Sequence, residues 1–133
     1  MTERDILLRQ FLDARRGTAF RPGLLDCALF AADWIVELTG VDPAADWRGR
    51  YRTIEEGRAL LAADGFASPA EVLASMLVEG AGWMQAQTGD VAVLIEAGEE
   101  AMGVVGGGHI HALRPLRGLG VVPINRAVRI YRP

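Results

Sequence analysis

The sequence contains a single cysteine, Cys27, at a position where a thiol could act as a nucleophile. Asp26 is a good N-cap residue, so the apolar stretch that follows predicts a helix whose first residue is Cys27. Free backbone N–H groups and the positive end of the helix dipole favour a thiolate there. The alternative is that Cys27 is a small core residue, as lone cysteines on apolar helix faces commonly are. Position alone leaves both interpretations open.

Two histidines, His109 and His111, are the candidates for a general base. They follow the three glycines 106–108, and the whole segment predicts a β-hairpin. If the glycine turn is regular, strand alternation places His111 on the same side as Ala101 and lets it point into the same cleft. The competing interpretation is a pair of partly exposed histidines beside a flexible turn.

Helices that would position these residues come first in the chain. A helix is predicted over residues 3–15, with Thr2 and Asp5 as a capping box, and a second runs from Asp26 to Gly40. Residues 41–52 form an irregular link that is rich in turn signals. Two further helices are expected over about 53–65 and 68–77, because each starts with a Ser or Thr that is followed three residues later by Glu.

Strands follow the helices. After a turn at Gly89-Asp90, they are predicted over about residues 91–95, 102–105, 109–113, 119–124 and 127–131. Helices followed by strands predict an α+β fold, with N-terminal helices packed on a meandering antiparallel sheet of four to six strands. The 133 residues, half of them hydrophobic, fit a single domain over 1–133.

Several segments together resemble the NlpC-type papain-like cysteine peptidases of the cell wall. Residues 25–34, LDCALFAADW, resemble the start of these enzymes, in which an Asp-Cys pair opens the nucleophile helix. Residues 89–94, 102–108 and 110–112 resemble their first three core strands. Order and spacing agree over roughly residues 20–115, so the resemblance implies a papain-like fold.

A closer resemblance is to a small family found beside tail genes in phages, prophages and gene-transfer elements. The shared features are the DCALFAAD helix, the Thr39-Gly40-x-Asp42-Pro43 link and the Arg48-Gly49-x-Tyr51 segment. This resemblance implies a structural or adaptor protein of the tail tip or hub, with other tail-tip or hub proteins as partners. It also implies assembly into a phage-like particle, a virion component.

The resemblance also shows what is missing. In active NlpC-type enzymes the second strand begins with the catalytic histidine, and here Ala101 stands in the matching place. Alanine cannot take a proton from a thiol, so a pseudoenzyme is predicted. The alternative is a peptidoglycan hydrolase or amidase that uses Cys27, with His111, which matches the family's third polar residue, as a displaced base. A cytoplasmic cysteine hydrolase or transferase unrelated to phage is a third hypothesis.

The other motif residues are expected to be structural. Asp33 lies six residues after Cys27, on roughly the opposite side of the helix, and should contact Arg48 or Arg50. Trp34 is expected in the core, whereas Trp47 and Trp83 fit either a groove or the core. The structural set comprises Asp26, Asp33, Asp42, Pro43, Arg48, Tyr51, Gly89 and Asp90. Apolar residues near 83–84 and 128–131 are candidates for contact with a partner.

Composition excludes several classes of function. A net charge of -3 argues against nucleic-acid binding, and all fourteen basic residues are Arg, scattered along the chain. One cysteine permits no internal disulfide, and with two histidines it gives no zinc site, so neither a metal nor a cofactor is expected. No signal peptide or membrane span is recognisable, which predicts synthesis in the bacterial cytoplasm without export by the usual signal route.

Overall fold

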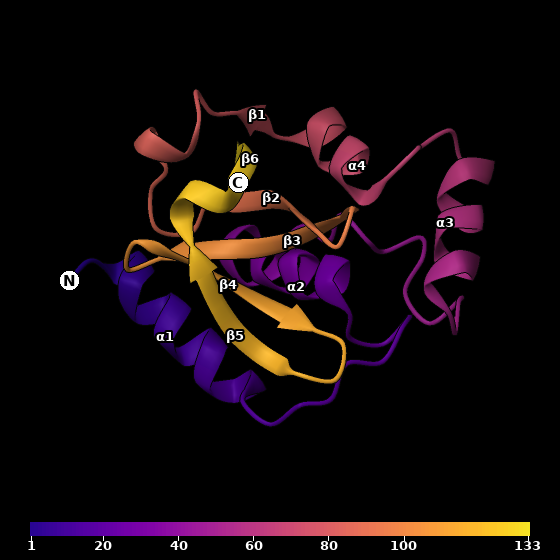
Figure 1. The fold of residues 1–133 in the computed structure, drawn as a ribbon, viewed down its shortest axis with the longest axis horizontal. Coiled ribbons are helices and arrows are strands. Elements are labelled where there is room, and N and C mark those ends of the chain that lie inside the picture. Colours follow the sequence, from indigo (N-terminus) through magenta and orange to yellow (C-terminus); the bar gives the residue numbers. More distant parts are fainter.

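A computed structural model describes all residues from 1 to 133 and shows a layer of helices against one six-stranded sheet (Figure 1). This confirms the predicted α+β class and the four predicted helices. The helices are α1 (Glu3–Arg15), α2 (Cys27–Thr39), α3 (Ile54–Ala63) and α4 (Pro69–Met76). None of them is both long enough and apolar enough to cross a membrane.

Local capping sets the helix boundaries. Thr2 and Asp5 form the predicted capping box of α1, and the side chain of Asp26 caps the first turn of α2. Gly40 ends α2 in the left-handed conformation, with φ of 80°, which glycine adopts without steric cost. Thr53 and Ser68 accept hydrogen bonds from the third residue of α3 and α4. Each helix therefore begins where a short polar side chain replaces a missing backbone partner.

The sheet has the order β1-β6-β2-β3-β4-β5, and all its pairings are antiparallel. Strands β2 to β5 form a meander, but the predicted simple meander is wrong at the end, because β6 returns to lie between β1 and β2. The two-residue strand β1 was not predicted. The strands are β1 (Val78–Glu79), β2 (Val91–Glu96), β3 (Glu99–Gly106), β4 (His109–Arg114), β5 (Gly118–Pro123) and β6 (Ala127–Arg132).

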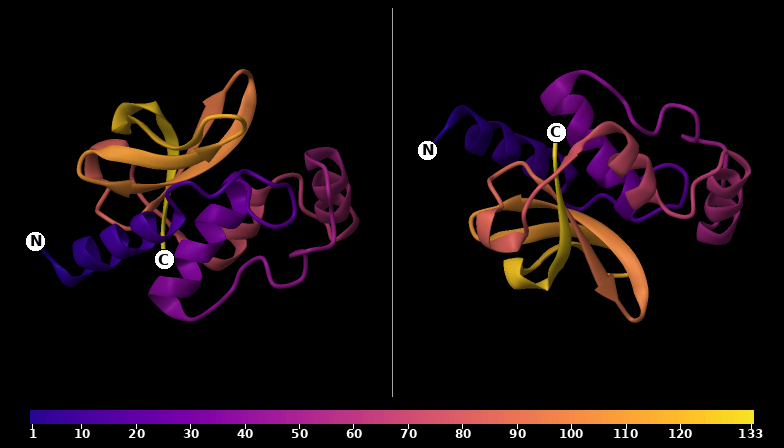
Figure 2. Two further views of the ribbon diagram at one scale, coloured as in Figure 1. Left: turned by 90° about the horizontal axis from the view of Figure 1, so that it is seen from below. Right: turned by 90° about the horizontal axis from the view of Figure 1, so that it is seen from above.

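Apolar residues gather on both faces of the sheet. Figure 2 shows the helices lying on one of these faces. The main core lies between the sheet and helices α1, α2 and α4, and includes Phe11, Trp34 and Met102. A second cluster, with Leu94 and Ile110, occupies the opposite face. The 3-10 turns η1 (Trp83–Gln85) and η2 (Ile124–Arg126) lie near this second cluster.

A third cluster is set apart from the sheet. It consists of Trp47, Leu61 and Val72, with the ring of Phe66 packed edge-on against Trp47. Helix α3 belongs to this cluster and stands at one end of the molecule, beyond α2 and α4 (Figure 1). We call the three residues Trp47, Leu61 and Val72 the satellite cluster.

Candidate functional site

Cys27 is the first residue of α2, as the sequence predicted, and Asp26 holds that helix start in place. Asp26 is buried, and its carboxylate accepts three hydrogen bonds. The donors are the backbone N–H of Leu29 at 2.9 Å, the N–H of Gly23 at 3.2 Å and the hydroxyl of Tyr51 at 2.5 Å. These three hydrogen bonds hold the carboxylate of Asp26 in place, so its role is to anchor the start of α2.

Cys27 is half-buried as a residue, and its thiol lies on the buried side, against the backbone of Met102 on β3. Burial raises its pKa to about 11, and the negative charge of Asp26 acts in the same direction. The backbone amides of Met102 and Ala28 oppose this shift only in part. The expectation that the helix start would lower the pKa of Cys27 is therefore wrong, because loss of hydration outweighs it. At neutral pH the group is a neutral thiol.

The hairpin between β3 and β4 places His111 differently from the prediction. Gly107 and Gly108 have φ of 61° and 76°, which fits a two-residue type I′ turn. This turn pairs Gly106 with His109 and Val104 with His111. Directly paired residues of antiparallel strands share a face, so His111 lies on the face of Val104. Only a three-residue loop would have placed His111 on the face of Ala101. The prediction that the two residues share a face is therefore wrong.

Ala101 points away from Cys27. Its side chain packs with the second cluster, on the face of the sheet opposite the helices, whereas Met102 belongs to the main core. Strand alternation makes this unavoidable once Met102 faces α2. A histidine at position 101 would therefore lie on the far side of the sheet from the thiol.

Neither histidine is hydrogen-bonded to Cys27. His111 is half-buried, and its Nε2 lies 3.2 Å from the carbonyl oxygen of Gly106. Burial lowers the pKa of His111, so its imidazole is neutral at pH 7. His109 is exposed at the turn, with Nδ1 3.0 Å from the carbonyl oxygen of Gly107. The thiol thus lacks the directly bonded base that a cysteine nucleophile uses.

A pocket of about 150 Å³ adjoins Cys27 and is lined mainly by hydrophobic side chains. It lies between α2, α3, α4 and the start of β3, and neither histidine lines it. Its walls include Leu29, Trp47, Tyr51, Leu61, Val72 and Met102. The concave surface next to the thiol is therefore apolar, and sequence reasoning did not find it, because its walls come from five separate segments.

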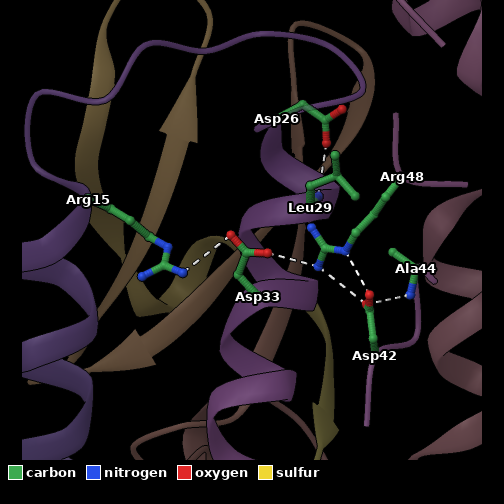
Figure 3. Close-up of polar contacts among 7 residues, drawn as sticks. All are labelled: Arg15, Asp26, Leu29, Asp33, Asp42, Ala44 and Arg48. Atoms are coloured by element: carbon green, nitrogen blue, oxygen red, sulfur yellow. Dashed lines mark hydrogen bonds and ion pairs between the residues drawn. The ribbon is translucent and has the colours of Figure 1, made fainter. Parts of the chain in front are cut away.

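Arg48 joins the irregular link to the helices (Figure 3). Its guanidinium lies 2.8 Å from the carboxylate of Asp33 and 2.7 Å from that of Asp42, and Arg15 of α1 reaches Asp33 at 3.4 Å. The predicted contact of Asp33 with Arg48 is confirmed, and Asp42 is a second acidic partner of the same guanidinium. Arg50 instead donates to the backbone carbonyl of Asp46. Asp33 is thus a structural anchor.

Tyr51 docks the end of the link against the loop before α2. A Cβ on Gly23 would lie 1.9 Å from the carbonyl oxygen of Tyr51, and one on Gly57 would lie 3.0 Å from its ring. Only glycine permits this approach, and Gly23 also has φ of 84°. The sequence singled out Tyr51 but not the two glycines that receive it. Pro43, also in the link, is buried and lines the pocket.

The three tryptophans have different environments. Trp34 is fully buried and donates from Nε1 to the carbonyl oxygen of Gly89 at 2.8 Å, which confirms its core position. Trp47 is buried in the satellite cluster and donates to Asp64 at 2.8 Å. Trp83 is 40% exposed. Both interpretations therefore hold for Trp47, which is buried in a core cluster and also lines the pocket.

Gly89 and Asp90 form a buried junction at the start of β2. Asp90 accepts two hydrogen bonds from the guanidinium of Arg132, each at 3.0 Å, and one from the N–H of Gln87 at 2.8 Å. A Cβ on Gly89 would lie 2.7 Å from the side chain of Arg4. Both residues hold the start of β2 against other segments of the chain. Arg132 was not predicted, since it lies 42 residues away and belongs to no local motif.

Exposure corrects the candidate contact residues. Met84 and Val128 are 81% and 58% exposed, but Ile130 and Tyr131 are buried in the sheet. Ile130 and Tyr131 therefore cannot meet a partner, because β6 lies inside the sheet rather than at its edge. The structure holds no grouping of three or more His, Cys, Asp or Glu side chains suited to a metal ion.

Comparison with known protein families places nearly the whole chain in one of them. Residues 2–133, nearly the whole chain, match the family described as a domain of unknown function, DUF6950. No curated protein matches the sequence.

Proposed function

The chain belongs to the DUF6950 family, and we propose that it is a structural or adaptor protein of a phage-like tail tip or hub, built on a papain-like, NlpC-type fold that has lost its catalytic activity. One observation carries the proposal: Cys27 stands where a nucleophile would stand, yet no imidazole is bonded to it. A domain that keeps the framework of an enzyme without its base is better suited to binding or assembly than to hydrolysis.

The chemistry of amide hydrolysis explains why. A cysteine hydrolase needs a thiolate, a proton donor for the leaving amine and donors for the oxyanion. The raised pKa of Cys27 leaves almost no thiolate at neutral pH. No histidine lines the pocket beside Cys27 to supply the proton. Of the three requirements, only backbone N–H groups near the start of α2 remain.

The motif residues support a scaffold rather than a catalyst. Asp26 caps α2, Arg48 bridges two carboxylates, Tyr51 docks the link and Asp90 binds Arg132. Asp26, Arg48 and Tyr51 belong to the segments that resemble the tail-cluster family, and Asp90 belongs to a segment that resembles the NlpC-type enzymes. Each of these residues holds two segments together. Motif residues that maintain the shape of the domain, rather than carry out a reaction, fit a protein whose role is assembly.

In this proposal the protein is made in the bacterial cytoplasm and becomes a component of the particle, where its partners are other tail-tip or hub proteins. The exposed side chains of Trp83, Met84 and Val128 are the candidate contacts. The proposal includes neither binding to nucleic acid nor a membrane span.

The decisive test has two arms. Mass spectrometry of purified particles from a producing strain should detect the chain at a fixed ratio to tail-tip proteins. A defined muropeptide assay should show no cleavage by the purified domain, and Cys27→Ala should assemble into particles like wild type. Absence of the chain from particles, or cleavage that vanishes in Cys27→Ala, would refute the proposal.

A specific observation favours a second candidate, a cell-wall peptidoglycan hydrolase or amidase with Cys27 as nucleophile and His111 as displaced base. The hairpin register puts His111 on the helix-facing side of the sheet, the same side as Cys27, and its imidazole is neutral at pH 7. A neutral imidazole can accept a proton. This candidate requires that cleavage of muropeptides be lost in both Cys27→Ala and His111→Ala, while His109→Ala, at the exposed turn, retains it.

A further inference from the structure

The main core and the satellite cluster do not merge, and the pocket beside Cys27 occupies the space between them. Leu73 and Met102 of the main core line one side, and the satellite residues Trp47, Leu61 and Val72 line the other. Protein interiors are normally packed without gaps of this size. A pocket of about 150 Å³ with apolar walls therefore forgoes contacts that an apolar guest would restore.

The polar groups in the wall are already satisfied. Asp26 has three donors, and the hydroxyl of Tyr51 is one of them. The indole N–H of Trp47 donates to Asp64. The charged lining residues Arg58 and Glu100 are exposed, and Arg58 pairs with Glu99 at 2.9 Å. A guest inside the pocket would thus find only two free hydrogen-bond groups, both uncharged: the weak thiol and the hydroxyl of Ser68, which accepts from the N–H of Glu71 at 3.4 Å. Its buried part must therefore be uncharged.

We propose that this pocket binds a small uncharged aromatic ring. Its volume is that of a cavity known to hold benzene. The rings of Trp47 and Tyr51 form part of the wall and are fixed at their polar ends by hydrogen bonds, so they offer preorganised faces and edges. Cys27 and Met102 add sulfur-containing side chains, which contact aromatic rings favourably. The inference concerns this pocket alone and holds whether or not the chain is part of a tail.

The ring could come from a free small molecule or from an aromatic side chain of a peptide. The chemistry that the pocket recognises is the same in both cases. Benzyl alcohol represents the free molecule, because its hydroxyl can stay at the solvent side near Arg58 and Glu100. N-acetylphenylalanine amide represents the peptide side chain. Cyclohexylmethanol matches benzyl alcohol in size and polarity but has a saturated ring.

The test is titration of the methyl-labelled protein with each probe, followed by NMR. Benzyl alcohol should bind saturably and shift the methyl signals of Leu29, Leu61 and Val72, and cyclohexylmethanol should bind at least about threefold more weakly, in keeping with the aromatic contribution. Ala28→Leu places three extra carbons on a helical residue that lines the pocket, and it should weaken binding at least about tenfold. Ala59→Leu makes the same change on an exposed face of α3 outside the pocket and should bind like wild type.

A second readout covers the case in which Ala28→Leu does not fold. In wild-type protein, saturating benzyl alcohol should slow alkylation of Cys27 by iodoacetamide at least about fivefold, because the guest covers the thiol. Tighter binding of N-acetylphenylalanine amide would identify a peptide as the source, and binding of benzyl alcohol alone a free molecule. Absence of saturable binding, equal binding of the saturated ring, or unchanged binding to a folded Ala28→Leu would overturn the proposal.

Discussion

The thiol of Cys27 is under two opposing influences, and their balance decides what the residue can do. The start of α2 and the amide of Met102 favour the thiolate, while burial and the neighbouring carboxylate of Asp26 disfavour it. Burial and the Asp26 carboxylate outweigh the other two influences, so the pKa of the thiol is raised. The same residue with an imidazole beside it would be an activated nucleophile, so its chemistry depends on what stands next to it rather than on its place in the helix.

The raised pKa of Cys27 predicts a pH dependence of reactivity. Its pKa lies about two units above the ordinary value of 9.0, so near pH 7.5 the folded protein should react with iodoacetamide about 100-fold more slowly than the unfolded chain. The rate should keep rising toward pH 11. Alkylation kinetics followed by mass spectrometry measure this, and a midpoint below pH 8 would show that the thiol has a partner.

The same shift has a consequence for stability. Between about pH 9 and 11 the unfolded chain loses the thiol proton while the folded protein keeps it. The free energy of unfolding contributed by this group is therefore fully present below pH 9 and is lost as the pH rises through 11. Cys27→Ala should remove this part of the alkaline slope in urea titrations, and an unchanged slope would contradict it.

The ion pairs of Arg48 predict that this residue stabilises the link of residues 41–52. Arg48→Ala leaves Asp33 and Asp42 without their shared partner and should lower the free energy of unfolding by about 1–2 kcal/mol at pH 7, because the groups are only partly buried. Arg50→Ala is the matched control, since the side chain of the exposed Arg50 makes one hydrogen bond, to the backbone carbonyl of Asp46. It should change stability by less than about 0.5 kcal/mol. Thermal and urea unfolding compare the two variants.

The deficit of Arg48→Ala should shrink in acid. Burial alone would raise the pKa of Asp42, but hydrogen bonds from Arg48 and from the N–H of Ala44, with the charge of Arg48, outweigh it and lower the pKa. A lowered pKa adds stability that is present above the unfolded value of 3.8 and is lost as the pH falls through the folded value. Equal deficits for Arg48→Ala at pH 7 and pH 3 would argue that the pairing with Asp42 contributes nothing.

At the scale of elements, the sequence predicted what is local and missed what is distant. The four helices were found because their N-cap residues act on backbone groups three residues away; these caps are Thr2, Asp26, Thr53 and Ser68. The hairpin register was missed because three glycines fit either a two-residue or a three-residue loop, and the choice reverses the face of every residue after it. The contact of Arg132 with Asp90 has no local signal, and neither has the pocket.

The docking of the link against the loop before α2 predicts a large effect for Gly23→Ala. The added methyl group would meet the carbonyl oxygen of Tyr51, and the backbone has positive φ as well. Gly17→Ala is the control, because Gly17 has a similar φ of 79° but open space around it, so only the backbone cost of about 1 kcal/mol applies. Gly23→Ala should cost at least about 2 kcal/mol more in urea unfolding. Similar losses would show that the close approach is unimportant.

The strand alternation of β3 predicts that Ala101→His does not restore an active site. The imidazole would join the second cluster, behind the sheet, and should leave both the alkylation profile of Cys27 and muropeptide cleavage unchanged. Glu100→His is the comparison, since Glu100 lines the same pocket as Cys27. Replacing a carboxylate by an imidazole there should speed alkylation at neutral pH. Activity gained in Ala101→His would mean that the face of residue 101 is misassigned.

At the scale of the whole molecule, stability is unevenly distributed. Helix α2 contributes Phe30, Trp34 and Ile35 to the main core, whereas α3 contributes a single buried residue, Leu61, to the satellite cluster. The pocket separates the two. Segments with few buried contacts open at lower free energy than the core.

Hydrogen exchange should therefore distinguish the two helices. Backbone amides of α3 should exchange at least about tenfold faster than those in the middle of α2, and saturating benzyl alcohol should slow exchange in α3 while leaving α1 unchanged. Exchange followed by mass spectrometry resolves both segments. Equal protection of α2 and α3 would show that the satellite cluster is as firmly held as the main core.

The place of β6 in the sheet has a consequence for the order of events in folding. β6 pairs with β2 on one side and with β1 on the other, so β1 has no direct pairing with the rest of the sheet. Val78 and Arg132 are partners although 54 residues separate them, which makes this contact slow to form. The carboxylate of Asp90 likewise gains its ion-pair partner only after Arg132 has been placed beside it. During synthesis, the helices and the meander β2–β5 emerge first, with a buried carboxylate uncompensated and one edge of β2 bare, and the sheet is completed only when residues 127–132 arrive.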